Sequence, residues 1–207
     1  MKVILIVIML LLPLIFLGQD VFVKKVPNKD KAHLVIGIKK GDSTEWYFAG
    51  CSFKNITLLP DTTKMRLIGE LLDYTSDTIM CNNSIYNLSG RYTVIREQPL
   101  SKQYNLQVDA LVLINYIALS SKAFYYSPYP LLYDKETGKE ICCNSKGLNT
   151  VIAIYKDWYH ELRQKGFNDY CYPLCDKRYE WFGSMIKHQK FKDYPQWDNL
   201  FDCQEIE

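Results

Sequence analysis

The segment 105–120 constrains the fold most, because apolar residues occupy nearly all of its sides. Only Gln107, Asp109 and Asn115 interrupt the apolar pattern. A helix without a polar face has no side to offer to water, so this pattern predicts a central helix that other elements cover. A strand is the alternative for its middle, where Val and Ile are frequent. With 207 residues, the chain is long enough to bury such an element in a core.

Shorter patterns on both sides of this segment predict the other elements. Period-two alternation and aromatic content predict a β-hairpin, and helical spacing of apolar residues predicts two further helices. The hairpin is expected over 31–39 and 45–53, helices over 64–74 and 147–165, a strand over 91–97 and a second hairpin over 124–143, with a loop over 76–90. From residue 168 we expect irregular structure and a short helix.

These elements together indicate the α+β class. We expect a single domain over 19–207, with about three helices packed on a mostly antiparallel sheet of hairpins. The sequence contains no internal repeat and no Pro-, Gly- or Ser-rich linker that would divide it.

The first residues predict the compartment. Lys2 precedes an apolar run from Val3 to Leu17, and the small residue Gly18 follows, which is the plan of a secretory signal peptide over 1–18. The run is shorter than the roughly 20 residues that a spanning helix needs. We therefore expect an exported protein, periplasmic or secreted, with no stable membrane span after cleavage. An uncleaved N-terminal anchor is the alternative.

Charge and composition limit the partners. Lys and Arg number 25 and Asp and Glu 23, a balance that argues against nucleic acid as a partner, because nucleic-acid-binding domains are usually clearly basic. The hydrophobic content of 48% is close to that of globular proteins and excludes global disorder.

The expected export determines how the seven cysteines are interpreted. In an oxidising compartment disulfides are the default, and we expect one pair among Cys171, Cys175 and Cys203. A zinc site would combine Cys171 and Cys175 with His160, His188 or Cys203. Zinc ribbons and fingers normally have two tight ligand pairs, whereas this chain has one. We therefore expect no metal and no cofactor.

One helical turn carries the weak candidates for catalysis. Asp157, His160 and Glu161 stand at i, i+3 and i+4, a spacing at which a helix can present acid and base groups on one broad face. The simpler interpretation is a solvated charged surface. The sequence contains no G-x-S-x-G elbow, no glycine-rich phosphate loop and no cysteine marked as an activated nucleophile. An enzyme is therefore less favoured than a binding protein.

Aromatic residues make up 14% of the chain and concentrate in 124–133. Rings with a polar tip suit binding surfaces, because they offer contact area at low entropic cost. The candidate binding residues are Tyr125, Tyr126, Tyr129 and Tyr133. The alternative is that these rings fill the core and its rim.

Four stretches, at 106–119, 127–141, 155–167 and 179–183, resemble exported proteins of Bacteroides-group bacteria. They read LQVDALVLINYIAL, SPYPLLYDKETGKEI, YKDWYHELRQKGF and YEWFG, within a little over a third of the chain. The resemblance implies an exported protein, and toxin neutralisation is among the roles considered for such proteins. It implies no catalytic residue.

The hypothesis that these patterns favour is an exported, soluble binding module for a protein or glycan partner, with an immunity-like role among its forms. Two alternatives stay open: an exported hydrolase that uses Asp157, His160 and Glu161, and a structural component of a cell-surface assembly. The sequence leaves the oligomeric state open.

Overall fold

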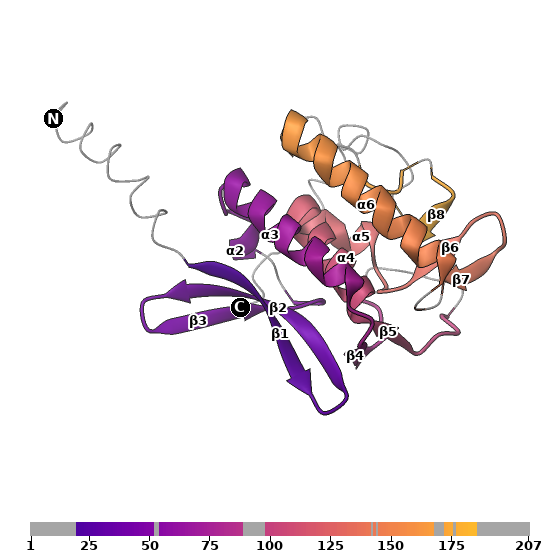
Figure 1. Ribbon diagram of the computed structural model, residues 1–207, viewed down its shortest axis with the longest axis horizontal. Helices are drawn as coiled ribbons and strands as arrows, with labels where there is room; N and C mark the ends of the chain where they lie inside the picture. The colour runs from indigo at the N-terminus through magenta and orange to yellow at the C-terminus, as the bar shows by residue number, and fades with distance from the viewer. Residues whose placement is uncertain are drawn as a thin grey trace, which may run out of the picture.

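The computed structural model describes residues 20–51, 54–88, 98–141, 143, 145–167, 172–175 and 177–185. These residues form an α+β fold of helices and two sheets, which confirms the expected class (Figure 1). In chain order the elements are β1 (Val21–Asn28), β2 (Lys31–Lys40), β3 (Ser43–Tyr47), α2 (Lys54–Thr57), α3 (Asp61–Asp73), η1 (Tyr74–Ser76), β4 (Met80–Ser84), β5 (Gln103–Asn105), α4 (Leu106–Leu119), η3 (Ser120–Lys122), α5 (Ala123–Tyr126), β6 (Leu132–Asp134), β7 (Lys139–Ile141), α6 (Lys146–Lys165) and β8 (Tyr179–Trp181).

The N-terminal sheet is built around β2. All of strand β1 pairs antiparallel with β2. Along the other edge of β2, β3 pairs antiparallel near one end and β4 pairs parallel at Ala32, opposite Cys81. Strand β5 then pairs antiparallel with β4. The sheet is therefore mixed, and all but one of these pairings are antiparallel.

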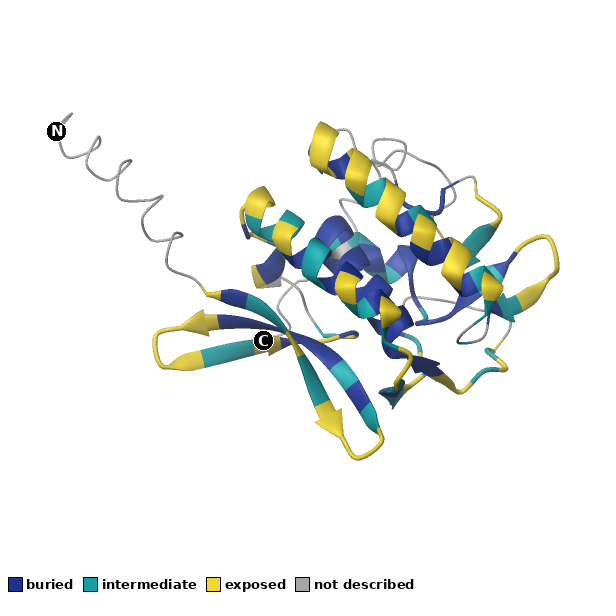
Figure 2. Cartoon of the chain, viewed as in Figure 1, coloured by how far each residue is buried: buried dark blue, intermediate teal, exposed yellow. Residues whose placement is uncertain are grey.

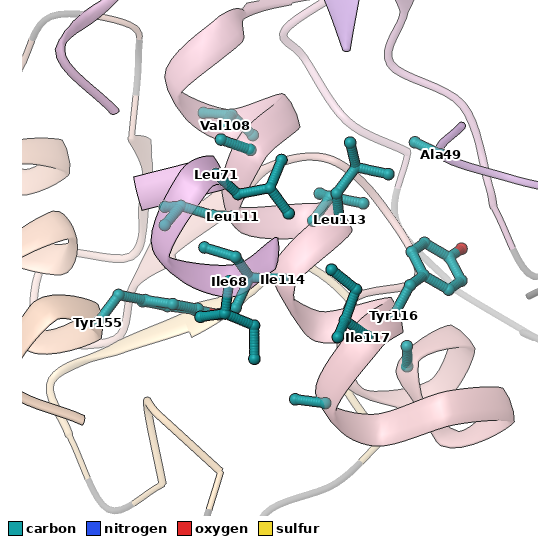
Figure 3. Close-up of a cluster of buried hydrophobic side chains, with 14 of the residues drawn as sticks. Ala49, Ile68, Leu71, Val108, Leu111, Leu113, Ile114, Tyr116, Ile117 and Tyr155 are labelled. Carbon is teal, nitrogen blue, oxygen red and sulfur yellow. The ribbon is translucent and has the colours of Figure 1, made fainter. Parts of the chain in front are cut away.

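Helix α4 is the centre of the core, as its sequence predicts. All 14 of its residues are buried, including the polar ones. Asn105 caps its first turn, since the Asn105 side chain accepts a hydrogen bond from the amide of Val108. Figure 3 shows Leu111, Ile114 and Ile117 of this helix among the buried side chains.

The helices form layers on one face of the N-terminal sheet. In Figure 1, α3 and α4 lie between that sheet and α6. The alternating residues Leu34, Ile36 and Ile38 of β2 are almost completely buried and form part of the same hydrophobic core as α4. Figure 2 shows α6 with a buried stripe on one side and exposed residues on the other. The predicted amphipathic helix is thereby confirmed.

A second, three-stranded sheet lies at the other end of the molecule (Figure 1). Its central strand β6 pairs antiparallel with both β7 and β8, so Leu132 lies opposite Ile141 on one side and Trp181 on the other. The turn from β6 to β7 ends at Gly138, which has a φ of +67°, in the region that favours glycine.

The expected second hairpin within 124–143 is confirmed as β6 and β7. Its first strand begins only after Pro128 and Pro130, and helix α5 precedes them. Two other sequence-based expectations are wrong. The expected loop over 76–90 contains β4, and the expected irregular tail contains β8. The proposed signal peptide over 1–18 and the expected strand over 91–97 lie outside the described residues.

Candidate functional site

A groove of about 830 Å³ lies beside the second sheet. One wall is the segment 98–101, and the other is formed by the β6–β7 hairpin and the residue that follows β8. Leu100 stands at its rim with 86% of its surface exposed. The lining residues are Gln98, Leu100, Ser101, Tyr133, Gly138, Lys139, Glu140 and Phe182.

The carboxylate of Glu140 holds the two walls together. It accepts hydrogen bonds from the amide of Leu100 at 2.6 Å and from the amide and hydroxyl of Ser101 at 2.8 and 2.6 Å. Partial burial raises the pKa of Glu140, but these hydrogen bonds outweigh it and leave the pKa below its ordinary value. The segment that carries Leu100 is therefore fixed in place before any partner binds.

Aromatic rings form the apolar part of the groove. Phe182 contacts Tyr129 and Tyr133 edge to face, with ring centroids 5.7 and 6.1 Å apart. Both tyrosines are half-buried, so each keeps part of its ring at the surface. These two members of the predicted aromatic surface thus lie at or beside the groove.

Tyr125 and Tyr126, the other two predicted binding residues, are buried. The hydroxyl of Tyr126 accepts a hydrogen bond from the amide of Leu174 at 2.8 Å, and its ring lies against that of Tyr172. Tyr126 thereby contributes to the packing of α5 against the C-terminal segment. The exposed part of the predicted surface is therefore limited to Tyr129 and Tyr133.

The structure does not bring all three residues of the predicted acid–base turn into one site. Asp157 and Glu161 line a cleft of about 270 Å³ between α6 and the segment around 172–177. His160 does not line it, and its Nε2 lies 3.0 Å from Nε2 of Gln164. The cleft also contains Ile154, Trp158, Tyr172, Pro173, Cys175 and Lys177. Two carboxylates and an indole ring thus share a cavity, and the imidazole lies outside it.

A buried carboxylate outside the predicted candidate sites lies in the core. Asp109 is only 1% exposed, and its Oδ2 accepts the amide hydrogen of Leu34 at 2.8 Å. The hydroxyl of Tyr104 lies 3.3 Å from Oδ1, and the thiol of Cys81 also donates to this carboxylate. Burial outweighs these hydrogen bonds and raises the pKa of Asp109 to about 6. The signal in the sequence was a lone acid within an apolar helix.

Cys81 and Cys51 have free thiols. Burial and the nearby Asp109 raise the pKa of Cys81 to about 12, which keeps this thiol protonated.

No disulfide joins two described cysteines. Of the cysteines predicted to form a pair, only Cys175 is described, whereas Cys171 and Cys203 lie outside the described residues. Within the described ranges no three His, Cys, Asp or Glu side chains are placed to hold a metal ion.

No family model matches this chain, and no curated protein or solved structure shows significant similarity to it. Its candidate sites therefore depend on their own geometry. Among the described residues, no helix is both long and apolar enough to cross a membrane.

Proposed function

We propose that this protein is an exported binding module whose groove beside the second sheet takes an apolar segment of a protein partner. The observation that carries the proposal is the exposure of Leu100 next to the rings of Tyr133 and Phe182. Leu100 and the half-buried Tyr133 together form an exposed apolar patch, and such a patch is typical of an interaction surface. The expected signal peptide over 1–18 supports export, and a periplasmic or secreted location is part of the proposal.

The fixed walls of the groove support this function. Because Glu140 already holds the segment 98–101, binding would not have to order that segment, and this lowers the entropic cost of association. Gln98, Lys139 and Glu140 provide a polar rim around the apolar centre, which is the usual composition of a protein interface. An aliphatic anchor such as Leu100 favours a protein over a glycan as the partner.

If the groove binds the partner, Leu100→Asp should weaken partner capture strongly. A carboxylate at this position would have to be desolvated in the interface, so we expect at least about a tenfold loss of affinity. The measurement compares immobilised wild-type and variant full-length chains by the exported proteins that each retains, quantified by mass spectrometry. Leu58→Asp is the matched control, since Leu58 is 67% exposed and does not line the groove.

Two results would overturn this proposal. Equal capture by wild type and Leu100→Asp would show that the groove is not the binding surface. Retention of glycans in a parallel binding assay, with no protein retained, would assign the surface to the other class of partner.

A hydrolase at the α6 cleft is the second candidate, and it is favoured by the position of Asp157 and Glu161 in one cavity. Paired carboxylates can act as general acid and base. If the chain hydrolyses a substrate there, Asp157→Asn and Glu161→Gln each lower turnover by about a hundredfold or more. His160→Ala is the matched control and leaves turnover unchanged, because His160 lies outside the cleft. Loss of activity in the His160 variant would contradict this assignment.

A further inference from the structure

An aromatic pair lies on the face of the N-terminal sheet opposite to the core. Phe22 of β1 and Trp46 of β3 are both paired with Gly37 of β2, so they lie on one face. Their rings meet edge to face with centroids 5.7 Å apart, and a Cβ at Gly37 would lie 2.7 Å from the Phe22 ring. Trp46 is 45% exposed. The glycine thus lets the Phe22 ring cover the centre of this face, while Trp46 keeps surface for another contact.

The same face is basic. Strand register places Lys24, Lys31 and Lys39 on it, and none of the residues of β1, β2 or β3 on this face is acidic. Asp20, which precedes β1 and lies beside Lys39, is the nearest acid in register. The Nζ of Lys24 lies 5.4 Å from the centroid of the Trp46 ring. None of these lysines pairs with an acid in the described part of the chain.

We call this surface the outer sheet face and define it by Phe22, Lys24, Lys31, Lys39 and Trp46. Its chemistry is an apolar aromatic centre with positive charge around it. A ligand that complements it must combine acidic groups with apolar or aromatic ones.

The sequence contains such a ligand at 193–207, beyond the described residues. The segment reads DYPQWDNLFDCQEIE, and it has five acidic residues and no Lys or Arg. It also has three aromatic residues, Tyr194, Trp197 and Phe201. In both charge and aromatic content it complements the outer sheet face.

The chain between the two is long enough for contact. Met185 is the last described residue, and seven residues, 186–192, separate it from the segment. Extended, the chain from Met185 reaches at most about 28 Å to Asp193 and about 60 Å to Cys203, whereas a domain of this size has a radius of gyration of only about 16 Å. A tethered segment also acts at a high effective concentration, so a few surface contacts suffice.

We propose that the segment 193–207 binds the outer sheet face of its own chain and covers it. The acidic side chains pair with Lys24, Lys31 and Lys39, and the aromatic ones pack against Phe22 and Trp46. An acidic partner would have to displace this segment to use the face. The segment is therefore an intramolecular competitor for that surface.

Cross-linking of the full-length chain tests this proposal, because Cys203 lies within the segment. The variant is Thr44→Cys, since Thr44 of β3 lies opposite Lys39. The protein is oxidised with diamide at low protein concentration. We expect a disulfide within one chain between the thiol introduced at position 44 and Cys203, identified by peptide mass mapping. The yield should fall at least about fivefold in 1 M salt, where screening shortens electrostatic range to about 3 Å, and also in Lys24→Glu/Lys39→Glu.

Asn149→Cys is the matched control, since Asn149 is exposed on α6, on the other side of the α3–α4 layer. It should give little cross-link to Cys203. Equal yields at positions 44 and 149, or a yield at 44 that is insensitive to both salt and charge reversal, would overturn the proposal. A disulfide formed only between two chains, and only at high protein concentration, would overturn it in favour of a second copy as the occupant.

Discussion

Replacing Trp181 with alanine is expected to lower the free energy of unfolding by about 3–5 kcal/mol, the usual range for a fully buried tryptophan. The side chain has no exposed surface. Its Nε1 donates to the hydroxyl of Tyr155 at 2.9 Å, and that hydroxyl donates to Oδ1 of Asn115 at 2.8 Å. The tryptophan therefore joins β8 to α6 and α4. Chemical denaturation of wild type and Trp181→Ala measures the difference in their free energies of unfolding.

One further variant separates hydrogen bonding from packing at this position, and a second serves as a surface control. Tyr155→Phe keeps the ring but leaves the indole N–H and the Asn115 oxygen without their partner, so a loss of about 1–3 kcal/mol is expected. Trp46→Ala is the size-matched surface control and should cost much less, since Trp46 is nearly half exposed. Equal destabilisation by Trp181→Ala and Trp46→Ala would contradict the role of Trp181 in the core.

The second large effect is the pH dependence caused by Asp109. Its pKa is about 6 in the folded protein against an ordinary value of 3.8, so the folded state binds a proton more tightly than the unfolded state. Stability is therefore lost as the pH rises from about 4 through 6, and the full penalty, about 3 kcal/mol, is present above that window. Below pH 4 both states are protonated and the penalty is absent.

Asp109→Asn isolates this contribution. The Asn oxygen can still accept the amide hydrogen of Leu34, but the side chain carries no charge. We expect the stability of the variant relative to wild type to increase by about 3 kcal/mol between pH 4 and pH 8. Asp73→Asn, at an exposed position on α3, serves as the control and should show no such increase. A pH-independent difference between Asp109→Asn and wild type would contradict a buried charge at this position.

The sequence predicted the elements whose apolar patterns are long. Helix α4 is apolar on all sides and lies in the core, and α6 has a single stripe and packs with one face. The hairpin of β2 and β3 also follows from its alternation. In each case the spacing of several apolar residues shows which side of the segment is buried, and this spacing distinguishes a helix from a strand.

The missed strands depend on pairing rather than on local pattern. Strand β4 is rich in Asn and Ser, and it forms because it pairs with β2 and β5. Strand β8 has only three residues, and its partner β6 lies more than 40 residues away in sequence. Contacts between such distant segments leave no periodic signal in a short run of residues.

The candidate site was predictable only in part. The aromatic stretch drew attention to Tyr129 and Tyr133, but composition could not distinguish them from the buried Tyr125 and Tyr126. Leu100 carries no signal in its local sequence, because its exposure depends on hydrogen bonds from its segment to Glu140, 40 positions away. A binding surface assembled from distant segments becomes visible only once the chain has folded.

Hydrogen exchange in the presence of the captured partner tests the proposed binding function most directly. We expect slower amide exchange over 98–101 and 132–141, in the two walls of the groove, when the partner is bound. Exchange on the exposed face of α6 should not change. Protection elsewhere, with both walls of the groove exchanging as in the free protein, would contradict the proposed function.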